Sequence, residues 1–316
     1  MNMYLAALLG FVLLFGGGEG LVRGAVAVAR RFGLSSLLIG LTVVAAGTSA
    51  PELIVSVSAA VKGNADIALG NVVGSNIFNV LGVLGVSALI APIVVKPAEV
   101  KRDTYVMVAA SVALAALAQL GVIGWPVGLL FVTGIVAYTV YSYRTEIKSR
   151  PAPSAELHEH EGEEFEGPSS LWVGVLYIAL GLAALVIGSQ LLVDGATQIA
   201  RAFGVPEAII GLTLVAIGTS LPELATSIAA AFRGHSDVAV GNVVGSNIFN
   251  ALFIIGTTAI VRPINVAERM AQVDLWVMVA VAVVLVPVLV KRGRIGRLLG
   301  LLFTAAYAVY AVLLLA

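Results

Sequence analysis

The chain has 316 residues, of which 59% are hydrophobic and only 11% are charged, and its mean hydropathy is +1.03. A soluble domain carries roughly 25% charged residues, so this composition excludes an ordinary soluble protein and favours a bilayer. The absence of cysteine excludes disulfides and cysteine-ligated metal sites, and the formal net charge of zero argues against a nucleic-acid surface.

Long apolar segments recur from one end of the chain to the other. A helix must have roughly 20 mostly apolar residues to cross the hydrocarbon core of a bilayer. The first segment contains Glu19 and Arg23 and has no basic region before it, so it is interpreted as a retained helix and not as a signal peptide. We expect an all-α membrane protein with ten transmembrane helices, near residues 3–29, 36–61, 66–91, 104–121, 124–143, 171–200, 207–232, 237–261, 271–290 and 296–316.

The chain repeats itself at a constant offset of 171 residues. Residues 40–53 (GLTVVAAGTSAPEL) align without gaps with residues 211–224 (GLTLVAIGTSLPEL), and residues 70–79 (GNVVGSNIFN) recur identically as residues 241–250. Five spans in each half would make the second half enter the membrane in the opposite sense, giving two inverted five-helix repeats. The predicted units are a first repeat (1–146, motif 40–79), a linker (147–170) and a second repeat (171–316, motif 211–250).

Lysine and arginine gather in the loops on one predicted side of the membrane. That side holds 13 of them, whereas the other side holds only Lys62, Arg201, Arg262 and Arg269. The positive-inside rule therefore predicts that both termini lie outside the cytoplasm and that the linker 147–170 is cytoplasmic. We expect an integral protein of the plasma (cell inner) membrane.

The linker is acidic. Residues 151–168 begin with prolines and continue with glutamates, among which lie His158 and His160. A metal-binding or regulatory tract is one interpretation. A solvated, self-repelling tether is favoured, because the acids lack the glycine-centred spacing of an EF-hand loop.

Two glutamates lie in the middle of predicted spans. Glu52 and Glu223 occupy equivalent positions of the two repeats, and no lysine or arginine lies near either of them within its own span. A charge at the centre of a bilayer costs at least about 2.5–3.5 kcal/mol. A bound cation would offset that cost. The alternative is a protonated glutamate that forms hydrogen bonds between helices.

A proline precedes each of these glutamates. Pro51 and Pro222 have no N–H group and clash with the carbonyl group four residues before them, so each helix should break there. The break should free backbone carbonyl groups over residues 45–48 and 216–219 beside the carboxylates. Oxygen ligands in flexible geometry suit Ca²⁺ and Na⁺, whereas Mg²⁺ demands a nearly ideal octahedron.

The second motif places polar residues on one helix face. Asn71, Ser75 and Asn79 follow one another at intervals of four residues, and Asn242, Ser246 and Asn250 do the same. The glycine pairs 70/74 and 241/245 have the small-xxx-small spacing that allows helices to approach closely. These polar groups could line the cation site, or they could serve only as hydrogen bonds between helices.

These motifs resemble those of a known family. GTSAPE (47–52) and GTSLPE (218–223), each followed by GNVVGSNIFN, resemble the alpha-repeats of the prokaryotic-type sodium/calcium exchangers in the cation/Ca²⁺ exchanger superfamily. The resemblance covers nearly the whole chain. It implies a ten-helix fold in which spans two, three, seven and eight form the ion-binding core, while spans one and six slide to give alternating access.

The resemblance also implies a set of ligands. It implies that Glu52 and Glu223 bind Ca²⁺ together with the carbonyl groups of Thr48 and Thr219, and that Na⁺ shares these groups. It further implies flanking Na⁺ positions formed by Ala45, Ser49 and Ser75 on one side and by Ala216, Ser220 and Ser246 on the other, with Asn79 and Asn250 facing the centre. Some microbial members and the potassium-dependent branch carry Asp in place of Asn250, and its absence here argues against K⁺ co-transport.

The expected function is therefore a secondary active antiporter, and not an enzyme, that exchanges Na⁺ for Ca²⁺ by alternating access. The expected partners are these two ions and the lipid bilayer, with no cofactor, no nucleic acid and no obligate protein partner. A Ca²⁺/H⁺ antiporter of the same fold is the nearest alternative, and a cation channel is an alternative from another class. An intramembrane hydrolase using Ser49 or Ser220 lacks a nearby base, because all three histidines fall in predicted loops.

Overall fold

The structure is a computed structural model that describes residues 2–32, 45–148, 170–233 and 236–315. Several predicted features lie outside these residues, namely the start of the second span (36–44), nearly all of the linker including His158 and His160, and His235. The described residues are mostly helical, in agreement with the expected fold class.

The first repeat contains eight helical segments and two short strands among its described residues. They are α1 (Met3–Arg31), α3 (Ala45–Thr48), α4 (Ala50–Val61), α5 (Ala65–Phe78), the π-helical turn η2 (Asn79–Val83), α6 (Leu84–Ile90), β1 (Ile93–Val94), α7 (Pro97–Ala118), β2 (Val122–Ile123) and α8 (Trp125–Lys148). The segments α5, η2 and α6 follow one another without a gap and form one continuous span.

The elements of the second repeat follow the same order where both repeats are described, except that two further π-helical turns flank α16. The elements of this repeat are α10 (Leu171–Phe203), α11 (Glu207–Ile210), η3 (Gly211–Val215), α12 (Ala216–Thr219), α13 (Leu221–Arg233), α14 (Ser236–Phe249), η4 (Asn250–Ile254), α15 (Ile255–Val261), β3 (Ile264–Asn265), η5 (Met270–Asp274), α16 (Leu275–Val286), η6 (Pro287–Arg292), β4 (Arg294–Ile295) and α17 (Arg297–Leu315).

In the described part of the chain, seven helices are long and apolar enough to cross a bilayer, and eight if the bent pair Glu207–Thr219 and Leu221–Phe232 counts as one span. The second expected span is described only over α3 and α4, because most of its first half lies outside the described residues. The helix of the fourth expected span, α7, begins at Pro97 and not at residue 104, and its first two turns contain four charged residues. The number of ten spans remains a prediction.

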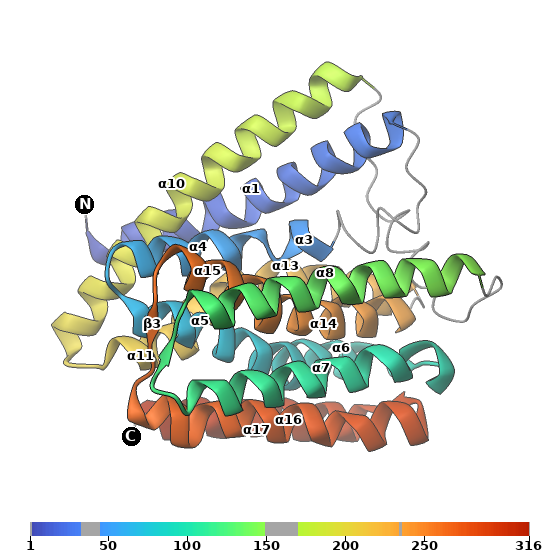
Figure 1. The fold of residues 1–316 in the computed structure, drawn as a ribbon. Coiled ribbons are helices and arrows are strands. Elements are labelled where there is room, and N and C mark those ends of the chain that lie inside the picture. The colour runs from blue at the N-terminus through green and yellow to red at the C-terminus, as the bar shows by residue number, and fades with distance from the viewer. Residues whose placement is uncertain (1, 33–44, 149–169, 234–235, 316) are drawn as a thin grey trace.

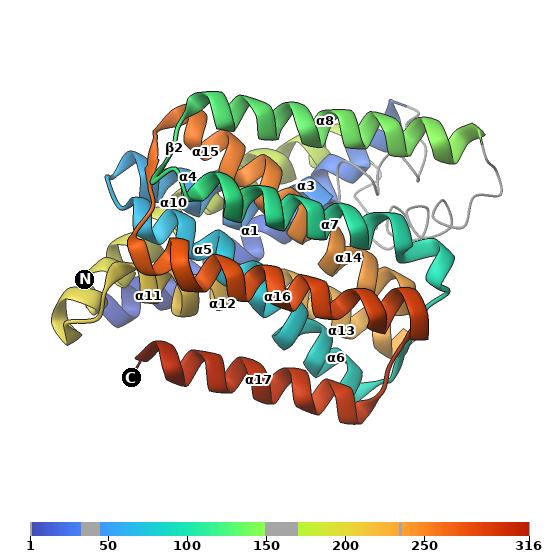
Figure 2. The ribbon, with the colours of Figure 1, turned by 60° about the horizontal axis from the view of Figure 1, so that its bottom comes forward.

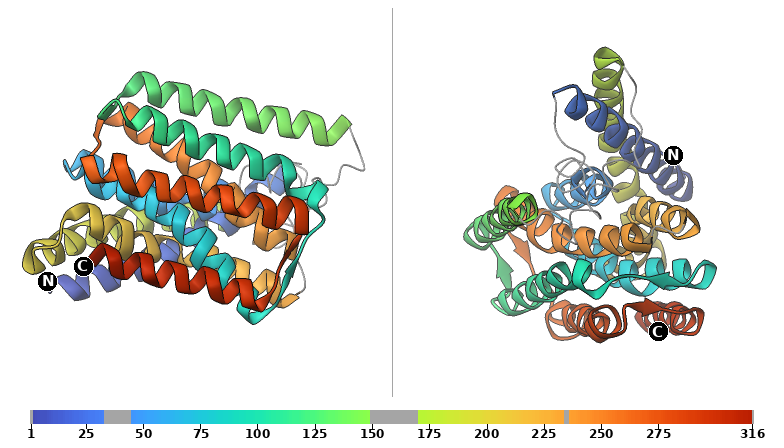
Figure 3. Two further views of the ribbon diagram at one scale, coloured as in Figure 1. Left: turned by 90° about the horizontal axis from the view of Figure 1, so that it is seen from below. Right: turned by 90° about the vertical axis from the view of Figure 1, so that its right-hand side faces the viewer.

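Helices α1 and α10 form a pair that lies across one side of the molecule (Figure 1). Seen end-on, this pair projects away from the stacked helices of the rest of the chain (Figure 3, right). Glycines allow the close approach: a Cβ atom on Gly17 would lie 2.9 Å from the carbonyl oxygen of Gly181. The first residues of α1 and the last residues of α17 lie at the same end of the molecule (Figure 1).

Two antiparallel ladders connect the repeats. Strand β1 pairs with β4, with Ile93 opposite Ile295, and β2 pairs with β3, with Ile123 opposite Ile264. Strand β2 lies in the turn between α7 and α8 (Figure 2). The sequence did not predict these strands, because strands of two residues are too short to show a periodic pattern. Each ladder takes one strand from each repeat, so the halves interlock.

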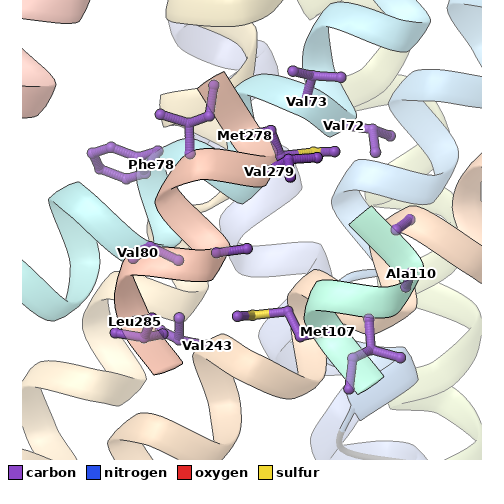
Figure 4. Close-up of a cluster of buried hydrophobic side chains, with 14 of the residues drawn as sticks. Val72, Val73, Phe78, Val80, Met107, Ala110, Val243, Met278, Val279 and Leu285 are labelled. Carbon is purple, nitrogen blue, oxygen red and sulfur yellow. The ribbon is translucent and has the colours of Figure 1, made fainter. Parts of the chain in front are cut away.

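The core of the molecule lies between the central spans of the two repeats. Helices α5 and α14 are flanked by α7 and α16, and most of the buried apolar side chains of the four elements belong to one hydrophobic cluster. Figure 4 shows part of this cluster, including Val72 and Val73 of α5, Met107 and Ala110 of α7, Val243 of α14, and Met278 and Val279 of α16. This packing holds the polar residues of α5 and α14 in fixed positions.

The predicted close approach of helices at the motif glycines is confirmed for the first repeat. A Cβ atom on Gly70 would lie 2.8 Å from the carbonyl oxygen of Ala208, and one on Gly74 would collide with the carbonyl oxygen of Leu212. No described residue comes within 4 Å of the corresponding position at Gly245. Helix α5 therefore lies directly against the segment from α11 to α12 of the other repeat.

Candidate cation site

Both helices that carry a central glutamate are interrupted where the prolines predict. Ser49 separates α3 from α4, and Ser220 separates α12 from α13, where the axis bends by 43°. The regular hydrogen bonding resumes at once, because the N–H groups of Leu53 and Leu224 donate to the carbonyl groups of Ser49 and Ser220, both at 3.1 Å. Each glutamate thus lies in the first turn of a new helix.

The carbonyl group of Ala216 is not freed by the break. It accepts hydrogen bonds from the N–H of Ser220 at 3.1 Å and from the hydroxyl of Ser75 at 3.4 Å, and Thr219 Oγ1 lies 3.3 Å from it. The expectation of a free carbonyl at this position is therefore wrong, because one residue in turn conformation is enough for the break and the ladder continues up to Ser220. Ala45 begins α3, but its side chain lies outside the described residues.

The two carboxylates are fully buried, and each is held by a serine of the other repeat. Ser220 Oγ donates to Glu52 Oε1 at 2.9 Å, and Ser49 Oγ lies 3.5 Å from Glu223 Oε1. Ser246 Oγ also donates to Glu223 Oε1, at 3.3 Å. The glutamates therefore meet at the interface between the repeats, as the duplicated motif predicts.

One oxygen atom of each glutamate has no hydrogen-bond partner among the described residues. Oε2 of Glu52 and Oε2 of Glu223 are buried and accept no hydrogen bond from any described residue. No lysine or arginine of the described residues forms an ion pair with either glutamate. A buried carboxylate without a partner is costly, so these two oxygens require a proton or a cation.

Asn71 and Asn242 support the backbone beside the glutamates. Each Nδ2 group donates to the carbonyl group of the glutamate of its own repeat, at 3.3 and 3.2 Å. Each also donates to a serine one turn further along, at 2.9 Å for Ser56 and 3.0 Å for Ser227. The Oδ1 atom of Asn71 accepts from Thr219 Oγ1 at 2.9 Å. These asparagines position the glutamates and bind them to the neighbouring helix.

Asn79 and Asn250 are arranged differently. Asn79 Nδ2 donates to Asn247 Oδ1, and Asn250 Nδ2 donates to Asn76 Oδ1, both at 3.0 Å. Their own Oδ1 atoms are buried and have no donor among the described residues. Each of the two begins a π-helical turn, a feature that is frequent at functional sites. Sequence reasoning missed Asn76 and Asn247, although both lie in the duplicated motif.

The remaining predicted residues also belong to this buried centre. Thr48 and Thr219 are buried beside the breaks, and Ser75 Oγ lies 3.5 Å from Thr219 Oγ1. Ser49 Oγ reaches Ser246 Oγ at 3.3 Å. Apart from Ala45, whose side chain is not described, every predicted site residue is therefore buried in this region, and most are connected by hydrogen bonds.

Helix α1 covers both breaks. A side chain on Gly47 would run into Val22, and one on Gly218 would run into Phe11. Both glycines therefore allow α1 to lie directly on the two interrupted helices. Movement of α1 would uncover them.

The buried acceptors without a donor at this centre, among the described residues, are all oxygen atoms. Four buried acceptors at this centre have no donor within the described ranges, namely Oε2 of the two glutamates and Oδ1 of Asn79 and Asn250. Among the described residues, no group of three or more His, Cys, Asp or Glu side chains could hold a metal ion. Two carboxylates with amide and hydroxyl oxygens suit hard cations such as Ca²⁺ and Na⁺, whereas sites for zinc or copper are built from imidazole and thiolate ligands.

Known proteins resemble this chain over nearly its whole length. The family model described as sodium/calcium exchanger protein matches residues 3–144 and 173–316. The chain is 39% identical over 310 residues to CaxA of Alkalimonas amylolytica, covering 97% of each chain. It is 32% identical over 358 residues to the sodium/calcium exchanger MaX1 of Methanosarcina acetivorans, covering 98% of each. A structure of the sodium-calcium exchanger NCX_Mj, soaked with Na⁺ and Sr²⁺, matches with a TM-score of 0.66 and 32% identity, covering 97% of this chain and 96% of that one.

Proposed function

This chain belongs to the sodium/calcium exchanger family, and we propose that it is a secondary active antiporter that exchanges Na⁺ for Ca²⁺ across the membrane, with Glu52 and Glu223 as the central cation ligands. The observation that carries the proposal is the set of four buried acceptor oxygens, contributed equally by the two repeats, that have no donor in the described part of the chain. Such a set is costly when empty and favourable when a cation fills it.

Charge balance explains why the two ions compete. Two carboxylates neutralise one Ca²⁺, and the same oxygens can bind Na⁺ ions instead, so that occupancy by one kind of ion excludes the other. An empty pair of glutamates leaves two unpaired charges at membrane depth, whereas a loaded pair does not. The conformational change is therefore favoured when the site is filled, as exchange requires.

The proposed ligands beyond the glutamates are the backbone carbonyls of Thr48 and Thr219 for Ca²⁺, with flanking Na⁺ positions at Ala45, Ser49 and Ser75 and at Ala216, Ser220 and Ser246, and with Asn79 and Asn250 facing the centre. Ala216 requires a local change. Its carbonyl accepts the Ser75 hydroxyl besides the N–H of Ser220, so the hydroxyl of Ser75 must turn away when an ion binds there.

We further propose ten spans in two inverted repeats, with α1 and α10 as the moving pair. The hydrogen bonds of Asn71 and Asn242 recur at the same offset of 171 residues as the motifs, which supports an equivalent role for the two halves. The position of α1 over both breaks supports its role as a gate. Both termini would lie outside the cytoplasm of a cell with this protein in its plasma membrane.

The test is Ca²⁺ uptake into proteoliposomes that contain the purified protein. An outward Na⁺ gradient is compared with an outward H⁺ gradient at matched membrane potential. Uptake driven by Na⁺ alone is the expected result. Uptake driven only by H⁺ would make the protein a Ca²⁺/H⁺ antiporter, and uptake that needs neither gradient would indicate a channel.

A further inference from the structure

The orientation of an asparagine amide decides what it offers to an ion. Its oxygen can bind a cation, whereas its NH₂ group, of nearly the same size, repels one. For Asn79 and Asn250 to be cation ligands, some other group must hold the amide so that the oxygen faces the ion. That group is the hydrogen-bond partner of Nδ2.

For both residues the partner is an asparagine of the other repeat. The Nδ2 group of Asn250 donates to Asn76 Oδ1, and that of Asn79 donates to Asn247 Oδ1, both at 3.0 Å. An amide oxygen can only accept a hydrogen bond, so it selects the NH₂ end of the neighbouring side chain. The Oδ1 atoms of Asn79 and Asn250 are then left buried and without a donor.

Asn76 and Asn247 are themselves held by groups that can only accept. Asn76 Nδ2 lies 3.3 Å from the backbone oxygen of Asn247 and 3.6 Å from Met278 Sδ. Asn247 Nδ2 lies 3.1 Å from the backbone oxygen of Asn76 and 3.7 Å from Met107 Sδ. Rotating either amide by half a turn would place oxygen against a carbonyl oxygen and a thioether. Both methionines belong to the hydrophobic cluster (Figure 4).

We propose that Asn76 and Asn247 are positioning residues for cation binding, each of which fixes the amide of the other repeat's asparagine with its oxygen free for the ion. The inference rests on the proposed function, since it requires a cation at this centre. It adds that each half of the site is oriented by the opposite half of the chain. Acceptor-only groups in the core determine the orientation, and Asn76 and Asn247 transmit it to Asn250 and Asn79.

Equilibrium binding of radiolabelled Ca²⁺ to the purified full-length protein tests this proposal without depending on the coupling ion. The Asn76→Leu variant removes the acceptor that orients Asn250, and the Kd for Ca²⁺ should rise about 10- to 100-fold, as when other outer-shell partners of metal ligands are lost. Ser111→Ala is the matched control. The Ser111 hydroxyl is also buried, but it donates only to the backbone of its own helix at 2.9 Å, so the Kd should not change.

The Asn250→Asp variant, used as a second background, distinguishes an orienting role of Asn76 from a role in packing alone. Aspartate offers two acceptor oxygens and no donor, so an Asn250→Asp site needs no orienting partner. In that background a carboxylate oxygen faces Asn76 Oδ1, so adding Asn76→Leu should lower the Kd or leave it within about twofold, which a double-mutant cycle detects as strong coupling. A loss equally large in both backgrounds would mean that Asn76 only fills space, and would overturn the proposal.

The opposite half provides the same test if Asn76→Leu fails to fold. Asn247→Leu is compared alone and with Asn79→Asp, with the same expected results. A wild-type protein that binds no Ca²⁺ would refute the proposed function and this inference with it. A wild-type protein that binds Ca²⁺, with an unchanged Kd in Asn76→Leu, would refute the inference alone.

Discussion

At the scale of single residues, the two glutamates differ from ordinary buried acids because only one of the two carboxylate oxygens of each accepts a hydrogen bond from the described residues. Oε1 of Glu52 and Oε1 of Glu223 accept hydrogen bonds from serines, whereas both Oε2 atoms accept none from the described residues. A purely structural buried acid would be expected to have all its oxygens paired. Because both glutamates show the same deficiency, a shared ligand explains it more simply than two separate defects.

Replacing either glutamate by glutamine should abolish Ca²⁺ transport and spare the fold. Glu52→Gln and Glu223→Gln each remove one of the two charges that balance Ca²⁺, and they remove an uncompensated buried charge from the ion-free protein. Ca²⁺ should raise the Tm of the wild type but not that of either variant, because only a bound ligand stabilises the folded state. Glu207→Gln, at the partly exposed start of α11, is the control and should transport normally. Substantial residual transport in either glutamine variant would contradict the assignment.

Sequence reasoning found the glutamates but missed the residues that orient the amides. A carboxylate in the middle of an apolar span is conspicuous on its own, so Glu52 and Glu223 could be predicted without any tertiary information. The role of Asn76 depends on which residue of the other repeat lies opposite to it, here Asn250 at 3.0 Å. The spacing of four residues places Asn71, Ser75 and Asn79 on one helix face, and Asn76 does not belong to that series.

At the scale of elements, the broken helix is the structure that builds the site. Pro222 prevents the hydrogen bond to Gly218, and the chain restarts as α13 with Glu223 in its first turn. The location of the break was predictable from the proline. The small extent of the disruption was not, because it depends on the backbone of one residue, Ser220, whose N–H still donates to Ala216.

Restoring the helix should therefore stabilise the protein and impair its function. Pro222→Ala returns an N–H donor that can bond to the carbonyl group of Gly218 and join α12 to α13 as one regular helix. We expect a higher Tm together with a Ca²⁺ Kd raised about tenfold, the usual exchange of stability against activity at strained sites. Pro206→Ala, at the N-cap of α11, changes a proline outside the break and should leave the Kd unchanged. A Pro222→Ala protein that binds Ca²⁺ normally would show that the break is dispensable.

At the scale of the whole molecule, the internal repeat in the sequence indicated that two equivalent halves would meet, and they do. What the sequence could not indicate is how they interlock. The ladders β1 with β4 and β2 with β3 involve only two residues per strand, and the crossing of Asn76 with Asn247 requires the packing of α5 against α14. Such contacts depend on distances between segments far apart in the chain, and no local pattern encodes them.

The proposed gating motion can be tested with paired cysteines, because the chain contains none of its own. A Cβ atom added at Gly47 would lie 3.4 Å from the Cβ atom of Val22, and a Cβ atom added at Gly174 would lie 3.4 Å from the Cβ atom of Ala27. Both distances are close to the Cβ–Cβ separation in a disulfide. The first pair ties α1 to the interrupted helix, and the second ties α1 to α10.

If α1 and α10 slide together over a fixed core, oxidation of Val22→Cys with Gly47→Cys should stop transport, and reduction should restore it. Oxidation of Ala27→Cys with Gly174→Cys should leave transport nearly intact. Equal rates in the oxidised and reduced forms of the first pair would exclude movement of α1 relative to the core, and loss of transport in the second would show that the two helices move against each other.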